Sequence, residues 1–200
     1  VYYTGFNSGK SFGANSYFIH HQEGNWLIDS PRYVPHLLKA FDRMGGIKYI
    51  FLSHEDDVAE AARYASWFGG TRIIHAHDAA AMPGAEWIVK ESGPFQVIPD
   101  FLVIPVPGHT PGSMALLYKQ RFLFTGDHLW WDRETNTLEV PSVYVWNEEQ
   151  LHRSTRCLME YQFEWVLPGH GSRINLPGTQ MRLELSRVVQ RFHKAESLRA

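Results

Sequence analysis

The chain has 200 residues, of which 19 are Lys or Arg and 21 are Asp or Glu, so its net charge is −2 with histidine neutral. This length predicts one domain over residues 1–200, large enough to bury about 70% of its unfolded surface without a cross-link. The near-neutral charge gives no electrostatic reason to expect a nucleic acid or an anionic membrane as a partner.

Residues 16–20 and 25–29 have the composition of two short strands joined by a hairpin turn. Apolar residues at helical spacing follow over 33–44 and again over 57–68, and a Gly-Gly pair ends each run. Between and after these helices, 47–52 and 71–75 are apolar runs with the length of buried strands. The amino-terminal part therefore alternates strands and helices.

The middle of the chain changes to short strands at 95–98, 101–106, 114–118 and 122–125, with no helix between them. Helical spacing returns after Asn147, a further strand is predicted at 164–167, and a long amphipathic helix at 180–198. Two blocks of strands flanked by helices predict the α/β class and a layered sandwich.

Two features of the sequence bear on where in the cell the protein is located. The single cysteine, Cys157, excludes an intrachain disulfide and permits a reducing compartment, so we expect a cytoplasmic protein. Residues 1–10 lack the apolar core of a signal peptide, and no stretch approaches about 18 uninterrupted apolar residues. We therefore expect a soluble chain with no membrane partner.

Four polar residues share one location, directly after a predicted strand: His54, His109, Asp127 and His170. In layered α/β proteins, ligands bind at the loops beyond the carboxyl ends of strands. Three imidazoles and a carboxylate are suitable ligands for zinc, iron or manganese. Any one of these residues alone is more often an ordinary loop residue, and their joint appearance is what favours a metal site.

The segments around these residues resemble, in order, the landmarks of the metallo-β-lactamase superfamily. They are Ser53-His54, Gly-His-Thr-Pro-Gly-Ser at 108–113, Thr125-Gly126-Asp127 and Pro-Gly-His-Gly at 168–171, with 27–29 resembling the amino-terminal signature. The resemblance implies a four-layer αββα sandwich with a metal cleft along one edge. It also implies one or two metal ions, usually zinc, iron or manganese, and hydrolysis of thioesters, β-lactams or phosphodiesters, or redox chemistry.

The sequence departs from the superfamily's main ligand motif, His-x-His-x-Asp-His, because it has His-Glu-Asp-Asp-Val-Ala over 54–59. The resemblance implies that His54 and His109 bind a first metal, that Asp127 bridges, and that His170 belongs to a second site. Asp56 occupies the place of the second histidine and still offers an oxygen. Val58 and Ala59 occupy the places of the aspartate and the last histidine, and neither carries a donor atom.

These substitutions leave two main hypotheses open. The first is a metal-dependent hydrolase with one divalent ion held by His54, Asp56 and His109, with Asp127 as a fourth ligand. Asp127 or Asp56 would then also be the catalytic proton acceptor. The second is a metal-free pseudoenzyme that acts as a binding module, which Val58 and Ala59 favour. An iron redox protein is a third, weaker hypothesis.

The sequence also offers candidates with simpler explanations. Asp56 and Asp57 are residue types that often cap the start of a helix. Glu60 is expected on an exposed helix face. His75, His77 and His128 are less favoured as ligands, and His128 is expected to point away from Asp127 because neighbouring side chains alternate. Four aromatic residues are expected mainly in the core, with a cleft or a homodimer contact as alternatives: Trp130, Trp131, Tyr144 and Trp146. The expected partner is a small-molecule substrate or ligand.

Overall fold

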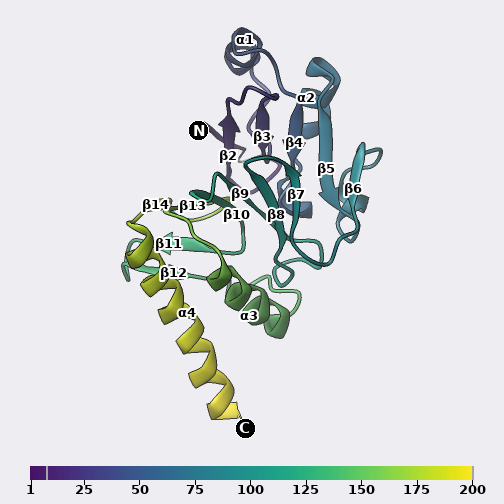
Figure 1. Cartoon of the computed structure of the whole chain (residues 1–200). Coiled ribbons are helices and arrows are strands. Elements are labelled where there is room, and N and C mark those ends of the chain that lie inside the picture. Colours follow the sequence, from purple (N-terminus) through teal and green to yellow (C-terminus); the bar gives the residue numbers. More distant parts are fainter. Residues whose placement is uncertain (8, 200) are drawn as a thin grey trace. The chain divides into compact units, whose positions relative to one another are not determined.

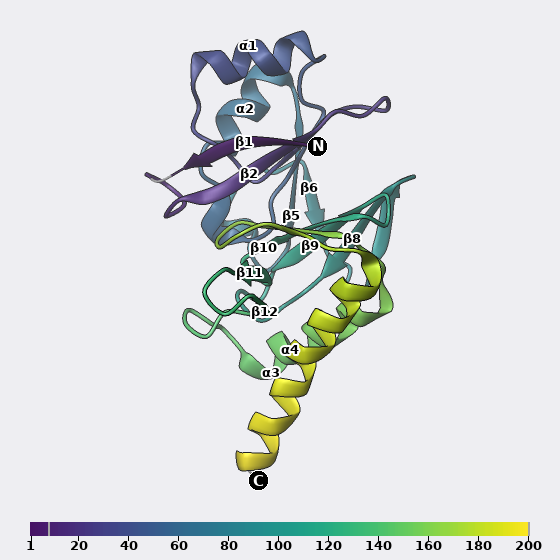
Figure 2. The ribbon, with the colours of Figure 1, turned by 90° about the vertical axis from the view of Figure 1, so that its left-hand side faces the viewer.

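A computed structural model describes residues 1–7 and 9–199, with side chains to 192. The chain divides into two compact units, Val1–Lys90 and Glu91–Ala200. Figures 1 and 2 label the elements of both. Each unit is a sheet with helices of its own.

The first unit contains a six-stranded sheet in the order β1-β2-β3-β4-β5-β6. β1, β2 and β3 pair antiparallel, and β3 to β6 pair parallel. The strands are β1 Tyr2–Asn7, β2 Ala14–Ile19, β3 Trp26–Ile28, β4 Tyr49–Phe51, β5 Thr71–His75 and β6 Trp87–Val89, and the helices are α1 Pro35–Arg43, α2 Ala61–Phe68 and the 3₁₀ turns η1 Glu55–Asp57 and η2 Ala79–Ala81.

The core of the first unit lies between this sheet and its two helices. Phe18, Leu27 and Ile50 from the strands are buried with Phe41 of α1 and Tyr64 of α2 in one apolar cluster. The rings of Phe18 and Phe41 stack with centroids 4.8 Å apart. Apolar residues recur at helical spacing in both helices, so one face of each contributes to this core.

The second unit contains a six-stranded sheet in the order β14-β13-β10-β9-β8-β7 and a separate pair, β11-β12. Its pairings are antiparallel except for β10 with β13, which is parallel. Its elements are β7 Phe95–Ile98, β8 Phe101–Pro105, β9 Met114–Tyr118, β10 Phe122–Gly126, β11 Trp130–Asp132, β12 Thr137–Glu139, α3 Glu148–Cys157, the 3₁₀ turn η3 Leu158–Glu160, β13 Trp165–Pro168, β14 Ile174–Asn175 and α4 Gly178–Arg199.

The core of the second unit again lies between sheet and helices. Leu117 and Val166 from the strands are fully or almost fully buried with Leu158, Leu185 and Val188, which come from η3 and α4. Helices α3 and α4 contact each other and lie close together in both views (Figures 1 and 2). α4 is amphipathic over its described side chains because Met181, Leu185 and Val188 recur every three or four residues.

The structure confirms the predicted α/β class with two large sheets. Three predicted strands have the observed bounds, namely Thr71–His75, Phe95–Ile98 and Met114–Tyr118. The short or edge strands β1, β6, β11, β12 and β14 were not predicted from the sequence. The prediction of one domain over 1–200 stays a prediction. Within the described residues, no helix is long and apolar enough to cross a membrane.

One predicted helix begins later than expected. The helix predicted over 57–68 begins at Ala61, and Glu55–Asp57 forms the 3₁₀ turn η1 instead. The residue that precedes α2 is Glu60, which makes no side-chain capping hydrogen bond. The capping role expected for Asp56 or Asp57 is therefore wrong, since neither residue lies at the start of this helix.

Candidate metal centre

In the first unit, the candidate residues lie where three parallel strands end. Asp29 follows β3, His54 follows β4, and Asp78 follows β5. Because parallel strands run in the same direction, the loops after them meet at one edge of the sheet. The backbone N–H of Glu55 donates to the Asp78 carboxylate at 3.1 Å, which joins the loops after β4 and β5.

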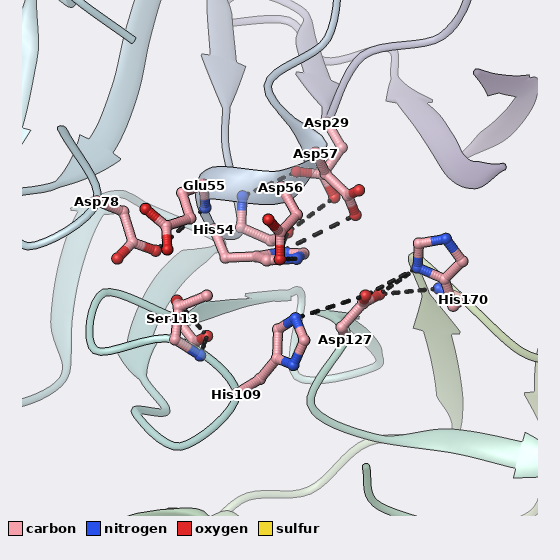
Figure 3. Close-up of polar contacts among 12 residues, drawn as sticks. Asp29, His54, Glu55, Asp56, Asp57, Asp78, His109, Ser113, Asp127 and His170 are labelled. Carbon is pink, nitrogen blue, oxygen red and sulfur yellow. Dashed lines mark hydrogen bonds and ion pairs between the residues drawn. The ribbon is translucent and has the colours of Figure 1, made fainter. Parts of the chain in front are cut away.

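His54 is buried and is oriented by its neighbours (Figure 3). Ser53 donates its backbone N–H to Asp29 Oδ1 at 2.8 Å and its hydroxyl to Asp29 Oδ2 at 3.1 Å. The same hydroxyl oxygen lies 2.9 Å from His54 Nδ1. Because the serine proton is directed to Asp29, its oxygen accepts the Nδ1 proton of His54, and Nε2 keeps the lone pair that a metal requires.

Asp56 lies on the Nε2 side of the same imidazole. Its Oδ2 is 3.7 Å from His54 Nε2, and its side chain is 46% exposed. This distance exceeds that of a hydrogen bond. It is near the separation of about 3.4 Å that two ligands have on one tetrahedral zinc ion with bonds of about 2.0–2.1 Å.

In the second unit, Asp127 follows β10 and His170 follows β13, which are the two strands that pair parallel. The carboxyl ends of these two strands therefore lie side by side, which brings Asp127 and His170 close together. His170 Nδ1 is 2.8 Å from the Asp127 carboxylate, and the backbone N–H of His170 donates to Asp127 Oδ1 at 3.1 Å. Figure 3 shows the imidazole of His170 directed at this carboxylate.

His109 completes the group in the second unit. Its Nε2 lies 3.8 Å from Asp127 Oδ2, again longer than a hydrogen bond and close to the spacing of two ligands of one metal. The loop that carries it is braced by Ser113, whose hydroxyl accepts the Thr110 N–H at 3.0 Å and whose carbonyl accepts the Val106 N–H.

Gly108 is the residue that lets this loop pass against α3. Its φ is +154°, and a Cβ at this position would overlap the backbone of Leu151. Only glycine accommodates both conditions without displacement of the helix. The backbone N–H of Asn147 at the start of α3 donates to the Gly108 carbonyl at 3.0 Å, so a hydrogen bond also joins the helix to the loop.

His128 is directed into the interior of the second unit. Its Nε2 lies 3.0 Å from the hydroxyl of Thr155 in α3. Burial, followed by the charge of His109, lowers the pKa of His128 from its ordinary 6.5 to about 3. It is therefore a neutral structural residue. Asp127 and His128 both lie after the end of β10 at Gly126, so the alternation expected of strand side chains does not apply to them.

The burial of His75 and of the four aromatic candidates is also defined by the structure. His75 is buried, and its Nδ1 accepts the backbone N–H of His77 at 3.2 Å. The expectation that the four aromatic residues pack in the core is wrong for two of them, because Tyr144 is 89% and Trp146 is 55% exposed. Trp131 does pack beside the apolar cluster of its unit.

Asp29 and Ser53 were assigned no separate function from the sequence, and Asp78 was not among the predicted site residues. Their position at strand ends could have shown Asp29 and Asp78, because both follow runs that were recognised as strands. No sequence pattern marks the hydroxyl of Ser53 as part of the site. Its function depends on the contact with Asp29, 24 residues earlier in the chain.

The donor atoms present fit a divalent metal. His54 and Asp56 offer these donors in the first unit, and His109 and Asp127 offer them in the second. Imidazole nitrogen and carboxylate oxygen together are ligands for zinc, iron and manganese. The assignment of individual residues to a metal stays a prediction.

No protein-family model matches the chain. It is 23% identical over 217 residues to YobT, an uncharacterized protein of Bacillus subtilis (strain 168), with 88% of this chain and 91% of YobT covered.

Solved structures give a consistent comparison. TTHA1623, solved in a di-iron-bound form, has a TM-score of 0.64 at 23% identity over 88% of this chain and 94% of that chain. ETHE1 from Myxococcus xanthus has a TM-score of 0.67 at 20% identity over 95% and 85%. The B3 metallo-β-lactamase BLEG-1 has a TM-score of 0.66 at 17% identity over 86% and 93%.

These similarities define the class of protein by its fold. The chain has the metallo-β-lactamase fold, and the resemblance of its motifs to that superfamily is confirmed at the level of the fold.

Proposed function

We propose that the protein is a metal-dependent hydrolase with an incomplete superfamily site that holds one divalent ion. Its ligands are His54, Asp56 and His109, with Asp127 as the fourth. The observation that carries this proposal is a repeated geometry: each unit presents a histidine Nε2 beside a carboxylate oxygen, at 3.7 Å for His54 with Asp56 and at 3.8 Å for His109 with Asp127. Both spacings suit ligands of a common metal better than hydrogen bonds.

The surrounding residues have defined tasks in this proposal. A bound divalent ion would polarise a carbonyl or phosphoryl oxygen and make water a better nucleophile near neutral pH. Asp29 and Ser53 hold His54 in the tautomer whose Nε2 is unprotonated. Asp127 accepts a proton from the attacking water, with Asp56 as the other candidate for this function. His170 orients Asp127 through its ring and its backbone N–H.

Two proteins with the same fold guide the choice of metal and reaction to test. TTHA1623 is solved in a di-iron-bound form and BLEG-1 is a B3 metallo-β-lactamase. Iron, zinc and manganese all suit a site of imidazoles and carboxylates. We propose zinc or iron as the first metals to test, and a hydrolytic reaction.

We propose a small molecule with an apolar group as the substrate. The loop before α3 exposes Tyr144 and Trp146, and the backbone N–H of Trp146 donates to the His109 carbonyl at 2.9 Å. This bond joins the backbone of the loop that carries the exposed aromatic residues to the backbone of a candidate ligand. Exposed aromatic groups beside a polar site favour contact with the apolar part of a ligand. A contact in a homodimer is the competing explanation for the same surface.

Val58 favours the alternative of a metal-free binding module. Its half-buried side chain packs against the apolar cluster of the first unit, so the position that carries an aspartate in the superfamily motif here makes an apolar contact. A binding module would retain the fold and would take up no metal. For either function we propose a reducing compartment such as the cytoplasm, since Cys157 is a free, exposed cysteine.

Elemental analysis of freshly purified, untagged protein, without chelator, tests the proposal. We expect at least one equivalent of zinc, iron or manganese, and loss of that metal in His109→Ala. His36→Ala is the matched control because His36 is exposed on α1. Unchanged metal in His109→Ala would contradict the proposed ligand set. No metal after incubation with zinc and iron would make the binding module the better explanation.

A further inference from the structure

A cavity of about 400 Å³ lies in the second unit, at the end of the sheet opposite Asp127 and His170. Gln120 lines it and precedes β10, whereas Asp127 follows that strand. Phe163 lines it and precedes β13, whereas His170 follows β13. Because β10 and β13 are parallel, they begin at one edge of the sheet and end at the other. The five residues of β10, at about 3.3 Å each, separate the cavity from Asp127 by about 15 Å.

The floor of this cavity is apolar. Phe163, Met181 and Leu185 line it and belong to the buried cluster of the second unit. Met159 of η3 lines it as well and packs against the same cluster. Because methionine side chains are flexible and fill irregular space, such a floor can accommodate an aliphatic chain. The volume of the cavity suits a small molecule.

The residues that line the cavity leave one positive charge uncompensated. Two of them are ionic, Glu164 and Arg182. Glu164 is paired, because Arg121 Nε donates to its Oε2 at 2.7 Å. Arg182 donates from Nη1 to the Met159 carbonyl at 2.8 Å, which holds its guanidinium beside the cavity. Among the residues whose side chains the structure describes, none supplies a carboxylate to Arg182.

A turn with left-handed backbone presents a further polar side chain to the cavity. Gln120 lies between β9 and β10 with a φ of +49°, and Lys119 before it has a φ of +54°. Glycine and asparagine adopt this region most readily, so a glutamine here favours a task for its side chain. Gln120 also lines a neighbouring cavity of about 1050 Å³, and the two cavities share Tyr161 and Gln162 as well. The second cavity offers room for a longer ligand.

We propose that this part of the second unit binds an amphipathic monocarboxylate such as a medium-chain fatty acid. Its carboxylate would lie at Arg182 and its apolar chain over Met159 and Phe163. A guanidinium forms charge-assisted hydrogen bonds with a carboxylate, and an apolar floor favours burial of the chain. The inference goes beyond the proposed hydrolase, because the cavity lies at the other end of the sheet and requires no metal.

Isothermal titration calorimetry of the whole chain with octanoate tests the proposal. We expect saturable binding of octanoate and no measurable binding of acetate, which lacks the apolar chain. In Arg182→Gln the affinity for octanoate should fall by about fivefold, as expected for a charge pair at an exposed guanidinium. The affinity for the uncharged 1-octanol should not change. Arg153→Gln is the matched control, because Arg153 is exposed on α3 and does not line the cavity.

Three results would overturn the inference. The first is the absence of saturable octanoate binding by the wild type. The second is an equal loss of octanoate and 1-octanol affinity in Arg182→Gln, since the carboxylate would then not be recognised. The third is a loss of octanoate binding in His109→Ala, which would place the carboxylate at the candidate metal centre. The metal content of the protein is measured separately, so the hydrolase proposal stands or fails independently.

Should Arg182→Gln fail to fold, Gln120→Gly decides. Glycine suits the φ of +49°, so this variant should unfold close to the wild-type temperature, because the relief of strain offsets the added freedom of the unfolded chain. It should bind octanoate more weakly, because one side chain that lines both cavities is lost. Wild-type affinity of Gln120→Gly for octanoate would contradict the proposed location.

Discussion

His170 and Asp127 are held together by two kinds of contact: the ring Nδ1 of His170 lies 2.8 Å from the Asp127 carboxylate, and its backbone N–H donates to Oδ1 at 3.1 Å. The backbone bond depends only on the parallel pairing of β10 and β13, which aligns the two loops. The ring contact depends on the histidine side chain. Asp127 is therefore positioned partly by the fold and partly by His170.

This division predicts different effects for two substitutions. In His170→Ala the backbone N–H still orients Asp127, so we expect the affinity for the metal to fall by about 10–100-fold, as for other residues that orient a ligand. In Asp127→Ala a ligand is lost, and the affinity should fall further. Competition with a chromophoric chelator measures both constants, and equal losses would contradict the assigned functions.

Gly108 predicts a large loss of stability on a minimal change. A Cβ at this position would overlap the Leu151 backbone and φ is +154°, so Gly108→Ala should lower the free energy of unfolding by at least about 2 kcal/mol. Gly93→Ala is the control, because no atom lies within 4 Å of its added Cβ. Urea unfolding of both variants is the measurement. Equal stabilities would show that the loop and α3 can separate at little cost.

Asn147 caps α3 by accepting the Gln150 N–H with its side-chain oxygen at 2.9 Å. Removal of such a cap in Asn147→Ala should destabilise the protein by about 1 kcal/mol. Asn147→Asp keeps an acceptor and adds a negative charge at the helix N-terminus, so its stability should be close to that of the wild type. The midpoints of urea denaturation compare the three proteins. An Asp variant as unstable as the Ala variant would exclude capping as the cause.

His128 predicts a pH dependence of folding stability. Its pKa is lowered from 6.5 to about 3 in the folded state, so below about pH 6.5 the unfolded state binds a proton that the folded state does not. Stability from this residue is therefore complete above pH 6.5 and is lost as the pH falls toward 3, by up to about 1.4 kcal/mol per pH unit.

Comparison with His128→Gln isolates this contribution from those of the carboxyl groups. The difference in unfolding free energy between the two proteins should shift in favour of the variant as the pH is lowered from 7 to 5. Denaturant unfolding at several pH values measures it. A difference that is independent of pH would mean that His128 has the same pKa in the folded and the unfolded protein.

Much of the fold and part of the site could be predicted because they depend on local patterns. Apolar runs of the right length gave the strands Thr71–His75, Phe95–Ile98 and Met114–Tyr118 with their observed bounds. The ends of such runs also located His54 and His109, since a polar residue after a buried strand falls at the edge of the sheet. Four of the missed strands, β6, β11, β12 and β14, have two or three residues each, which is too few for any periodicity. The fifth, β1, has six residues and was missed despite its length.

The chain's sequence by itself determined which donor atoms are available and where the core-forming segments lie, because these follow from residue type and spacing. Only the tertiary structure decided how the donors are used. The parallel pairing of β10 with β13 joins Asp127 to His170 across 43 residues. The 3₁₀ winding of Glu55–Asp57 brings Asp57 Oδ2 to 3.9 Å from His54 Nδ1, and Val58 packs against the apolar core of the first unit. Both outcomes depend on hydrogen bonds and packing between distant segments, which no pattern within a short stretch of sequence contains.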